Sequence, residues 1–270
     1  MSRSRKSTAR NGLAVACVLL IALAVTPGGP ASAHGGRDLW GAVTVVPGRQ
    51  GVVEVAGYSG DRLGSGSVLT LTAPARAEVT GTPLDARGYR GAVASGGRSG
   101  TYTFTGSSAG EPWRDRTFPF VLAVAADAVP GTRLTGCAMV LTDAHGAQKD
   151  RGSCAVTVGL PAPTLLRPAS GVPLGARPEA AGTAYPGAQV TVRDAAENEV
   201  CATTAATDGT WSCVPAQPLA PGPGLLQATA TLNGVSAMSE QIAVTVEGTP
   251  STLSDSAGGV LPGRDGVNAQ

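Results

Sequence analysis

The sequence predicts an all-β protein, with two tandem β-sandwich domains that follow a cleaved signal peptide. Three observations support this prediction. The chain begins with a basic stretch and an apolar run. Most of the remaining sequence alternates Val, Thr, Ile and Leu with small or polar residues, which is the period-two pattern of half-buried strands. A proline-rich segment without this alternation then divides the strand-rich region into two parts.

Residues 1–33 have the three parts of a secretory signal peptide. "MSRSRKSTARNG" is basic and has no acidic residue, an apolar run follows at 13–25, and "TPGGPASA" ends in the A-x-A pattern at Ala33. The apolar run is too short for an ordinary membrane-spanning helix, and a retained signal anchor is the alternative. We therefore predict cleavage after Ala33 and a secreted, extracellular protein without a stable membrane anchor, with loose attachment to the cell wall as a variant of this prediction.

Each predicted domain contains several short strands. Residues 34–160 include "GAVTVVPG", "SVLTLTAP", "FPFVLAVAADA" and "SCAVTVGL", and residues 161–247 include "AQVTVRD", "EVCATTA" and "EQIAVTVEG". Strands spaced by roughly 8–12 residues indicate a sandwich or a barrel. The junction is placed in "GLPAPTLLRPASGVP" at 159–173, and residues 248–270 are predicted to be a disordered tail because they hold few large apolar residues.

Four cysteines remain after removal of the leader, namely Cys137, Cys154, Cys201 and Cys213. An even number in an exported chain indicates two disulfides, although four cysteines allow three pairings. We favour sequential pairing because each pair lies within one predicted domain.

The spacing of each cysteine pair makes a prediction about strand register. A two-residue turn at His145-Gly146 would place Cys137 opposite Cys154 across a hairpin, unless "KDRGS" at 149–153 contains a bulge. For the second pair, the stretch "ATDGTWSCVP" at 206–215 predicts a turn at Asp208-Gly209 rather than an acid catalyst. A hairpin that opposes the second pair would instead be centred on Thr207, so a longer loop or a bulge would have to absorb the offset.

Trp211, which follows the predicted turn, is expected to be a structural core residue. It lies two residues before Cys213, so both side chains share one face of a strand and Ser212 takes the other face.

The composition speaks against several classes of function. The formal net charge is +1, and removal of the leader leaves the chain about three units negative, without the basic patch of a nucleic-acid-binding protein. His34 and His145 are the only histidines, which leaves little material for a Ser-His-Asp triad or a zinc site. We therefore predict no enzyme activity, no catalytic residues, no cofactor and no metal, and His145 is expected to be an exposed turn residue.

One loop has the composition of a ligand-binding site. In "SSAGEPWRDRTF" at 107–118, Trp113 with Arg114 and Arg116 would present a stacking ring and two guanidinium groups. The alternative, which we favour, is that Trp113 folds back onto the sandwich and leaves the charges in solvent.

A second loop, "RDAAENE" at 193–199, raises a calcium alternative. Asp194, Glu197 and Glu199 supply hard oxygen ligands. Their spacing matches no calcium-loop motif, so a solvated hairpin tip is favoured.

The second predicted domain resembles the bacterial immunoglobulin-like repeats of exported and surface proteins, especially those of actinobacteria. The residues that carry the resemblance are "AGTAYPGAQVTVRD" at 181–194, "TDGTWSC" at 207–213 and Pro218-Leu219, and it extends over residues 162–247. The first domain is more loosely similar to other immunoglobulin-like domains of secreted actinobacterial proteins. The resemblance implies immunoglobulin-like sandwiches that serve as spacers, adhesive modules or appendages of enzymes.

Together these observations predict a secreted, non-catalytic immunoglobulin-like module that binds or supports other components outside the cell. An extracellular protein or a cell-wall glycan is the expected partner, and nucleic acid is not. Two alternatives are a polysaccharide- or cell-wall-binding module that uses Trp113, Arg114 and Arg116, and a secreted proteinase inhibitor that offers a loop held by a disulfide.

Overall fold

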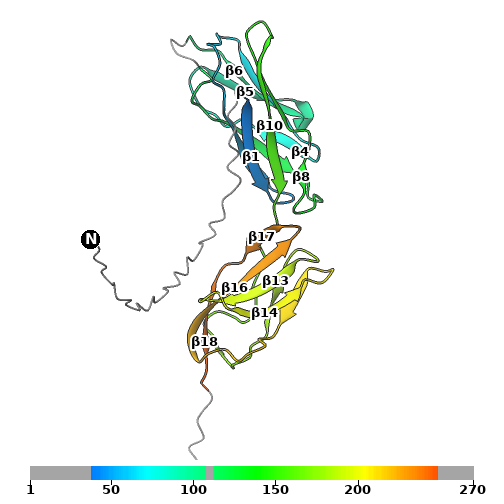
Figure 1. The fold of residues 1–270 in the computed structure, drawn as a ribbon, viewed down its shortest axis with the longest axis vertical. Helices are drawn as coiled ribbons and strands as arrows, with labels where there is room; N and C mark the ends of the chain where they lie inside the picture. The colour runs from blue at the N-terminus through cyan, green and yellow to red at the C-terminus, as the bar shows by residue number, and fades with distance from the viewer. Residues whose placement is uncertain (1–37, 108–111, 249–270) are drawn as a thin grey trace, which may run out of the picture. The chain divides into compact units, whose positions relative to one another are not determined.

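The computed structural model describes residues 38–107 and 112–248. The predicted signal peptide and nearly all of the predicted tail lie outside these residues. The described part contains strands β1 to β18 and one short 3-10 helix, η1 (Ser95–Gly97) (Figure 1). The fold is all-β, as predicted, and is consistent with an immunoglobulin-like β-sandwich. No helix among the described residues is long and apolar enough to cross a membrane.

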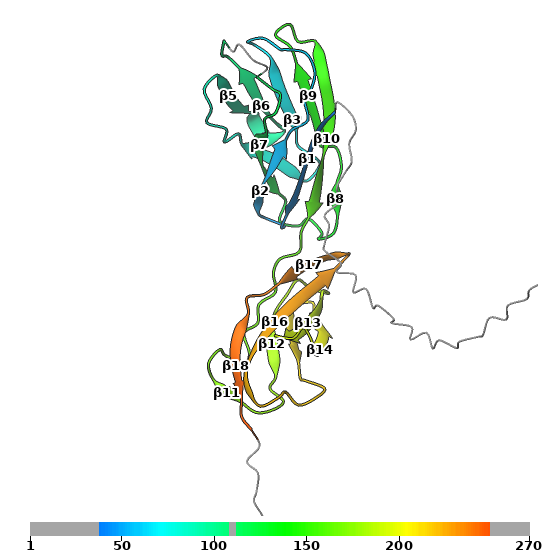
Figure 2. The same ribbon diagram turned by 60° about the vertical axis from the view of Figure 1, so that its left-hand side comes forward.

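Two sheets form the first sandwich, which comprises strands β1 to β10. The larger sheet has the order β1 (Leu39–Val45), β10 (Gln148–Val158), β9 (Ala138–Thr142), β3 (Val68–Thr72), β6 (Ser99–Phe104) and β5 (Tyr89–Val93), and β8 (Arg133–Leu134) also pairs with β10. The smaller sheet has the order β2 (Gln50–Val55), β7 (Phe118–Val124) and β4 (Ala77–Gly81). Figure 2 shows the strands of both sheets.

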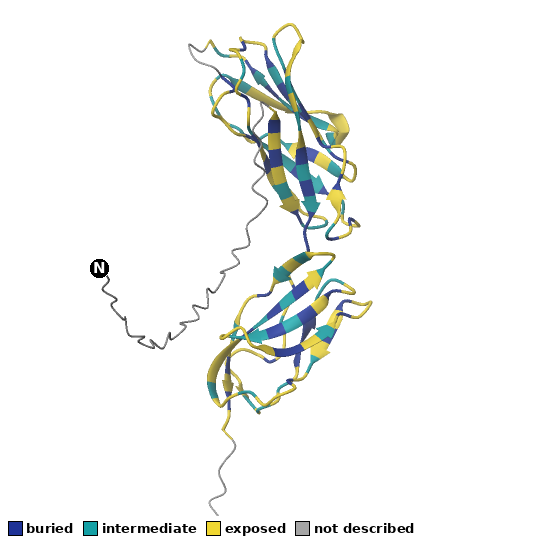
Figure 3. Cartoon of the chain, in the orientation of Figure 1, coloured by how far each residue is buried: buried dark blue, intermediate teal, exposed yellow. Residues whose placement is uncertain are grey.

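Strict alternation directs the apolar side chains of the first sandwich inward. Along β7 buried and half-buried residues alternate without a break, so Phe118, Phe120, Leu122 and Val124 enter the core. The same alternation is visible along β1 and β10 in Figure 3. These inward side chains form one contiguous core that runs in sequence from Leu39 to Val158.

The second sandwich comprises strands β11 to β18. Its larger sheet has the order β11 (Pro173–Leu174), β18 (Ile242–Val246), β16 (Gly222–Leu232), β13 (Gln189–Asp194) and β14 (Glu199–Thr204), with β17 (Val235–Met238) paired to β16. Its smaller sheet pairs β12 (Ala180–Thr183) with β15 (Thr210–Cys213). A separate core runs in sequence from Leu160 to Val244.

The first disulfide joins Cys137 to Cys154, the pairing that the sequence favoured. The predicted two-residue turn at His145-Gly146 is wrong. The backbone N–H of Asp143 donates to the carbonyl of Ala147, which closes a three-residue loop. A register shift between Gln148 and Asp150 compensates for the extra loop residue. The strand register beside the cysteines is therefore the predicted one, although the turn is not.

The second disulfide joins Cys201 to Cys213, again in the favoured pairing. The expected hairpin between their strands is absent, because β14 pairs with β13 and β15 pairs with β12. After the turn at 206–210 the chain passes from one sheet to the other, so this disulfide links the two sheets of the second sandwich. The offset that the sequence predicted thus reflects a change of sheet and not a bulge.

Candidate functional site

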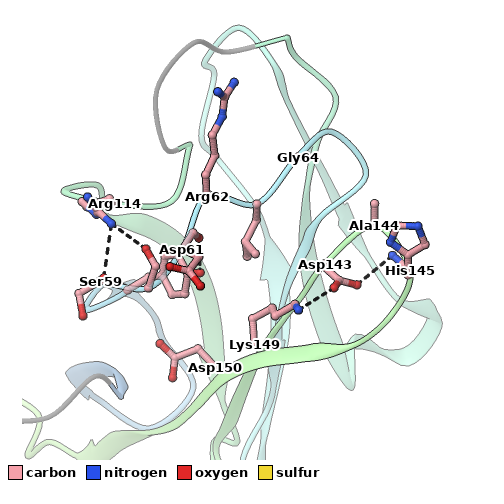
Figure 4. Close-up of a pocket in the computed structure, with 13 residues that line it drawn as sticks. Ser59, Asp61, Arg62, Gly64, Arg114, Asp143, Ala144, His145, Lys149 and Asp150 are labelled. Carbon is pink, nitrogen blue, oxygen red and sulfur yellow. Dashed lines mark hydrogen bonds and ion pairs between the residues drawn. The ribbon is translucent and has the colours of Figure 1, made fainter.

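An open cleft of about 490 Å³ lies on the first sandwich (Figure 4). Three segments that are distant in sequence line it. They are the loop 58–64 between β2 and β3, Arg114 in the connection that leads to β7, and the hairpin 143–150 that joins β9 to β10. Seven of the lining side chains are ionisable groups of both signs: Asp61, Arg62, Arg114, Asp143, His145, Lys149 and Asp150.

Buried side chains fix the loop 58–64 from beneath. Tyr58 and Leu63 lie in the core, and the Tyr58 hydroxyl donates to the carbonyl oxygen of Asp61. Ser67 is fully buried, and its hydroxyl donates to the carbonyl oxygen of Gly64 at 2.8 Å. These bonds satisfy buried polar groups and hold the loop against the core.

Arg114 ties a second segment to the same loop. Its guanidinium group donates to the carbonyl oxygen of Gly60 at 2.7 Å, with a longer contact to that of Ser59 at 3.5 Å (Figure 4). These donors are therefore occupied by the loop, and Arg114 acts mainly as a clamp between two walls of the cleft.

The hairpin wall is held by one carboxylate. Oδ1 of Asp143 accepts hydrogen bonds from the backbone N–H groups of His145 at 2.9 Å and Ala147 at 3.0 Å. The other oxygen pairs with the Lys149 ammonium group at 3.0 Å. The hydrogen bond from Lys149 is the largest cause that lowers the pKa of Asp143. His145 lies exposed in this turn.

Asp150 and Arg62 are two further charged groups of the cleft, and Oδ1 of Asp150 accepts a hydrogen bond from the backbone N–H of Arg151 at 2.7 Å. Among the ion pairs of the described residues, none involves either side chain. Burial raises the pKa of the half-buried Asp150, and the nearby carboxylate of Asp38 adds to this effect. Arg62 extends outward from its loop (Figure 4). The cleft thus offers an acceptor and a donor to a polar ligand.

Trp113 folds back onto the sandwich, as the favoured of the two alternatives for this loop expected, and it presents no exposed stacking ring. Only 2% of Trp113 is exposed, and its indole Nε1–H donates to the buried hydroxyl of Ser67 at 2.8 Å. Its ring packs against Phe118 with the ring centroids 4.9 Å apart. A large aromatic side chain beside an apolar core gains more from burial than from exposure, so Trp113 folds back and supports the cleft from within.

The two arginines of that predicted site also have separate roles. Arg114 clamps the loop 58–64, whereas the Arg116 guanidinium carbon lies 5.6 Å from the centre of the Tyr89 ring, a cation–π geometry. The structure therefore places Arg114 in the cleft and directs Arg116 to a different neighbour. In the second sandwich, Trp211 is 4% exposed and belongs to the core.

No group of three metal-binding side chains is assembled within residues 38–107 and 112–248. The acidic loop at 193–199 is a hairpin tip. Oδ1 of Asp194 accepts hydrogen bonds from the backbone N–H groups of Ala196 and Asn198, each at 2.9 Å. This carboxylate therefore closes the turn between β13 and β14.

Sequence reasoning missed the cleft because its walls come together only in the folded chain. The loop "YSGDRLGSGS" at 58–67 carries a recognisable signal, since glycine, serine and charged residues interrupt two strand patterns. Neither its contact with Arg114 nor its position beside the hairpin 143–150 follows from local patterns.

No known protein family and no curated protein matches this sequence. Among solved structures, the chain is similar to the BSP domain of a biofilm-associated protein, with 15% identity and a TM-score of 0.27 over 79% of this chain. It spans 30% of that structure. It is also similar to BcpA, the major pilin subunit of Bacillus cereus, with 10% identity and a TM-score of 0.34 over 77% of this chain and 68% of that one.

A third similarity is to the sixth cohesin from scaffoldin B of Acetivibrio cellulolyticus, solved in complex with a dockerin. The identity is 16% and the TM-score 0.31, over 45% of this chain and 97% of that one. None of these three similarities is close enough to indicate a function for this chain.

Proposed function

We propose that this chain is an exported, non-catalytic binding module that acts outside the cell and recognises a polar ligand through the cleft of its first sandwich. The observation that carries this proposal is the pair of disulfides, Cys137–Cys154 and Cys201–Cys213, one in each sandwich. Disulfides persist in oxidising compartments and are rare in the cytosol. The leader-like residues 1–33 point to the same location.

The rigidity of the cleft supports a binding role. The bond of Arg114 to Gly60 joins two of its walls, and the bonds of Asp143 to the hairpin backbone fix the shape of the third wall. A site that keeps its shape without a ligand loses little conformational entropy on binding. Arg62 and Asp150 then remain to contact hydroxyl or charged groups of the ligand.

The test uses the secreted, disulfide-bonded protein recovered from culture medium. It is presented to proteins of the culture supernatant and to isolated cell walls, and retention is compared between the wild type and an Arg62→Ala/Asp150→Asn variant. Removal of two charge-assisted contacts is expected to weaken retention by at least about ten-fold. A matched control, Arg177→Ala/Glu240→Gln, changes two exposed charges of the second sandwich and is expected to bind like the wild type.

Two results would contradict the proposal. Equal retention of the wild type and the cleft variant would exclude the cleft as the site. Accumulation of the protein inside the cell with free thiols, measured by alkylation and mass spectrometry, would exclude the extracellular role.

A further inference from the structure

Trp40 differs from every other aromatic residue of the chain. The three tryptophans, four tyrosines and three phenylalanines all lie within the described residues, and Trp40 is the one classed as exposed. Its exposed fraction is 51%, compared with 2% for Trp113 and 4% for Trp211. A large aromatic surface left in water on a folded protein often marks a contact site.

The backbone beneath this ring is fixed on both sides. On one side Trp40 exchanges two backbone hydrogen bonds with Ala56, at 2.9 and 3.0 Å. On the other side β1 runs parallel to β10, with Trp40 level with Ser153 (Figure 1). Trp40 is therefore held within hydrogen-bonded sheet structure and not in a loop.

The indole ring of Trp40 lies close to the backbone of Gly57. A Cβ atom at Gly57 would lie 2.8 Å from Cδ1 and 3.3 Å from Nε1 of Trp40. The φ angle of Gly57 is +111°, which L side chains rarely adopt. The absence of a side chain at this position lets the ring rest close to the backbone, which restricts its rotation before any ligand arrives.

The surroundings of the ring are flat and mostly small. Ala42 and Ser153 are exposed on the same outer face as Trp40, and Ala56 and Ala155 beside them are half-buried. Two exposed charged side chains, Glu54 and Arg151, lie near this row on β2 and β10. The surface thus combines one open aromatic ring with hydrogen-bonding groups.

We propose that Trp40 is a stacking platform for the flat face of a β-linked pyranose polymer, with Glu54, Arg151 and Ser153 placed to bond its hydroxyl groups. The C–H face of such a sugar matches one indole ring in size, and an extended polymer needs no enclosing walls. A protein partner fits this surface less well. One half-exposed tryptophan offers on the order of 100 Å², whereas a stable protein interface buries about 800 Å² on each partner.

This inference goes beyond the proposed function, because it places a contact surface outside the cleft and names a class of ligand, and it rests on that function only for its biological setting. Its test is independent, because it needs only the purified secreted protein. Retention is measured on insoluble cellulose, on chitin and on isolated cell walls. Fluorescence quenching by acrylamide is measured in parallel, since Trp40 is the exposed one of the three tryptophans.

We expect the wild type to bind at least one of these three polymers and to become less accessible to acrylamide when oligosaccharides of that polymer are added. Trp40→Ala should weaken retention by at least about ten-fold, because it removes the apolar area that the sugar covers. Trp40→Phe should retain part of the binding. Ala42→Arg, which keeps the indole and places a long charged chain beside it, should also reduce retention. Leu166→Ala removes an apolar side chain that is 63% exposed and should have no effect.

Unchanged thermal transitions of the Trp40 and Ala42 variants would exclude misfolding as the cause of lost binding. Equal retention of the wild type, Trp40→Ala and Ala42→Arg would overturn the proposal. A wild type that binds none of the three polymers would overturn it as well. If Trp40→Ala instead abolished capture of a supernatant protein while no polymer bound, the platform would be a protein contact. Loss of binding in the Arg62→Ala/Asp150→Asn variant alone would leave the cleft as the site and would also contradict the inference.

Discussion

The two sandwiches differ most in how their cores are filled. The first core contains Tyr58, Tyr102, Phe104, Trp113, Phe118 and Phe120, and neighbouring rings among them lie 4.9 to 5.7 Å apart. The second core contains one buried aromatic residue, Trp211, among Ala, Val and Leu. Because large side chains supply most of the buried apolar area, the second core depends more on a single residue.

The disulfides follow the same contrast. Cys137 and Cys154 lie beside paired strands of one sheet, whereas Cys201 and Cys213 link two sheets that share no strand pairing. In the second sandwich the disulfide therefore joins two sheets that the small core alone would hold together weakly. This difference leads to five predictions, given in order of decreasing effect.

The largest effect is expected from Trp211→Ala. Loss of this side chain should reduce the free energy of unfolding of the second sandwich by about 3–5 kcal/mol, which is comparable with the whole stability of many domains. Urea titration followed by amide NMR signals would show loss of the signals from 161–247 at low urea while those from 38–158 persist. Simultaneous loss of both sets would mean that the two cores do not unfold separately.

Removal of the disulfides should have the next largest effect. The cysteines are separated by 17 and 12 residues, so loop closure contributes about 3 kcal/mol in each case. Cys201→Ala/Cys213→Ala should nevertheless unfold the second sandwich at a lower denaturant concentration than Cys137→Ala/Cys154→Ala unfolds the first, since its core is poorer in large side chains. The reverse order of the unfolding midpoints would show that the aromatic core does not supply the difference.

A matched pair of substitutions compares the two buried indoles directly. The N–H of Trp113 is bonded to Ser67, whereas Nε1 of Trp211 is the buried side-chain atom among the described residues that lacks a hydrogen-bond partner. Trp113→Phe loses that hydrogen bond, whereas Trp211→Phe loses none. The first substitution should therefore lower the free energy of unfolding by about 1 kcal/mol more than the second. Chemical denaturation of both variants would measure the difference, and equal costs would contradict the assigned bond.

The two hairpin tips provide a smaller comparison. Asp143 and Asp194 close their turns in the same way, but the left-handed position is Gly146 in one, with φ of 80°, and Glu197 in the other, with φ of 63°. Glu197→Gly should stabilise the second sandwich, and Gly146→Ala should destabilise the first, each by about 1 kcal/mol. Thermal melts with shifts of the same sign for both variants would contradict this account.

Acid should affect the same two turns in different ways. The pKa of Asp143 is lowered chiefly by Lys149 and that of Asp194 chiefly by Asn198. Because the pKa of each carboxyl group is lower in the folded state, each carboxylate stabilises the fold at pH values above its unfolded-state pKa of about 3.9. This stabilisation is lost as the pH falls through the folded-state pKa. Added salt should weaken the contribution of Asp143, which faces a cation, more than that of Asp194. Unfolding curves of Asp143→Asn and Asp194→Asn at low and high salt between pH 2 and about 6 would test this difference.

The sequence was sufficient for features that depend on local patterns. Alternation along "FPFVLAV" predicted a strand, on whose buried face Phe118 and Phe120 lie, and the position of each cysteine pair within one predicted domain led to the pairing found. The turn predicted at His145-Gly146 was wrong by one residue, because the sequence allowed a bulge in "KDRGS" but did not require one, and a register shift lies between Gln148 and Asp150. The same alternation in "DLWGAVTV" at 38–45 sets Trp40 on the face opposite Leu39, a signal that was present and was not used.

Features that depend on distant contacts could not be derived. The sequence between Cys201 and Cys213 looks like a hairpin, and only the partners β12 and β13 reveal the change of sheet. The burial of Trp113 depends on Ser67, which is 46 residues away. The cleft likewise combines three segments that no local pattern connects.

The central claim is that the first sandwich is the binding half of the molecule. Amide hydrogen exchange of the secreted, disulfide-bonded protein, measured by mass spectrometry with and without cello-oligosaccharides, chito-oligosaccharides and solubilised cell-wall fragments, tests it most directly. The account predicts added protection in residues 38–42, 58–64 and 143–153, and none in 161–247. Protection confined to the second sandwich, or no protection with any of the three ligands, would contradict it.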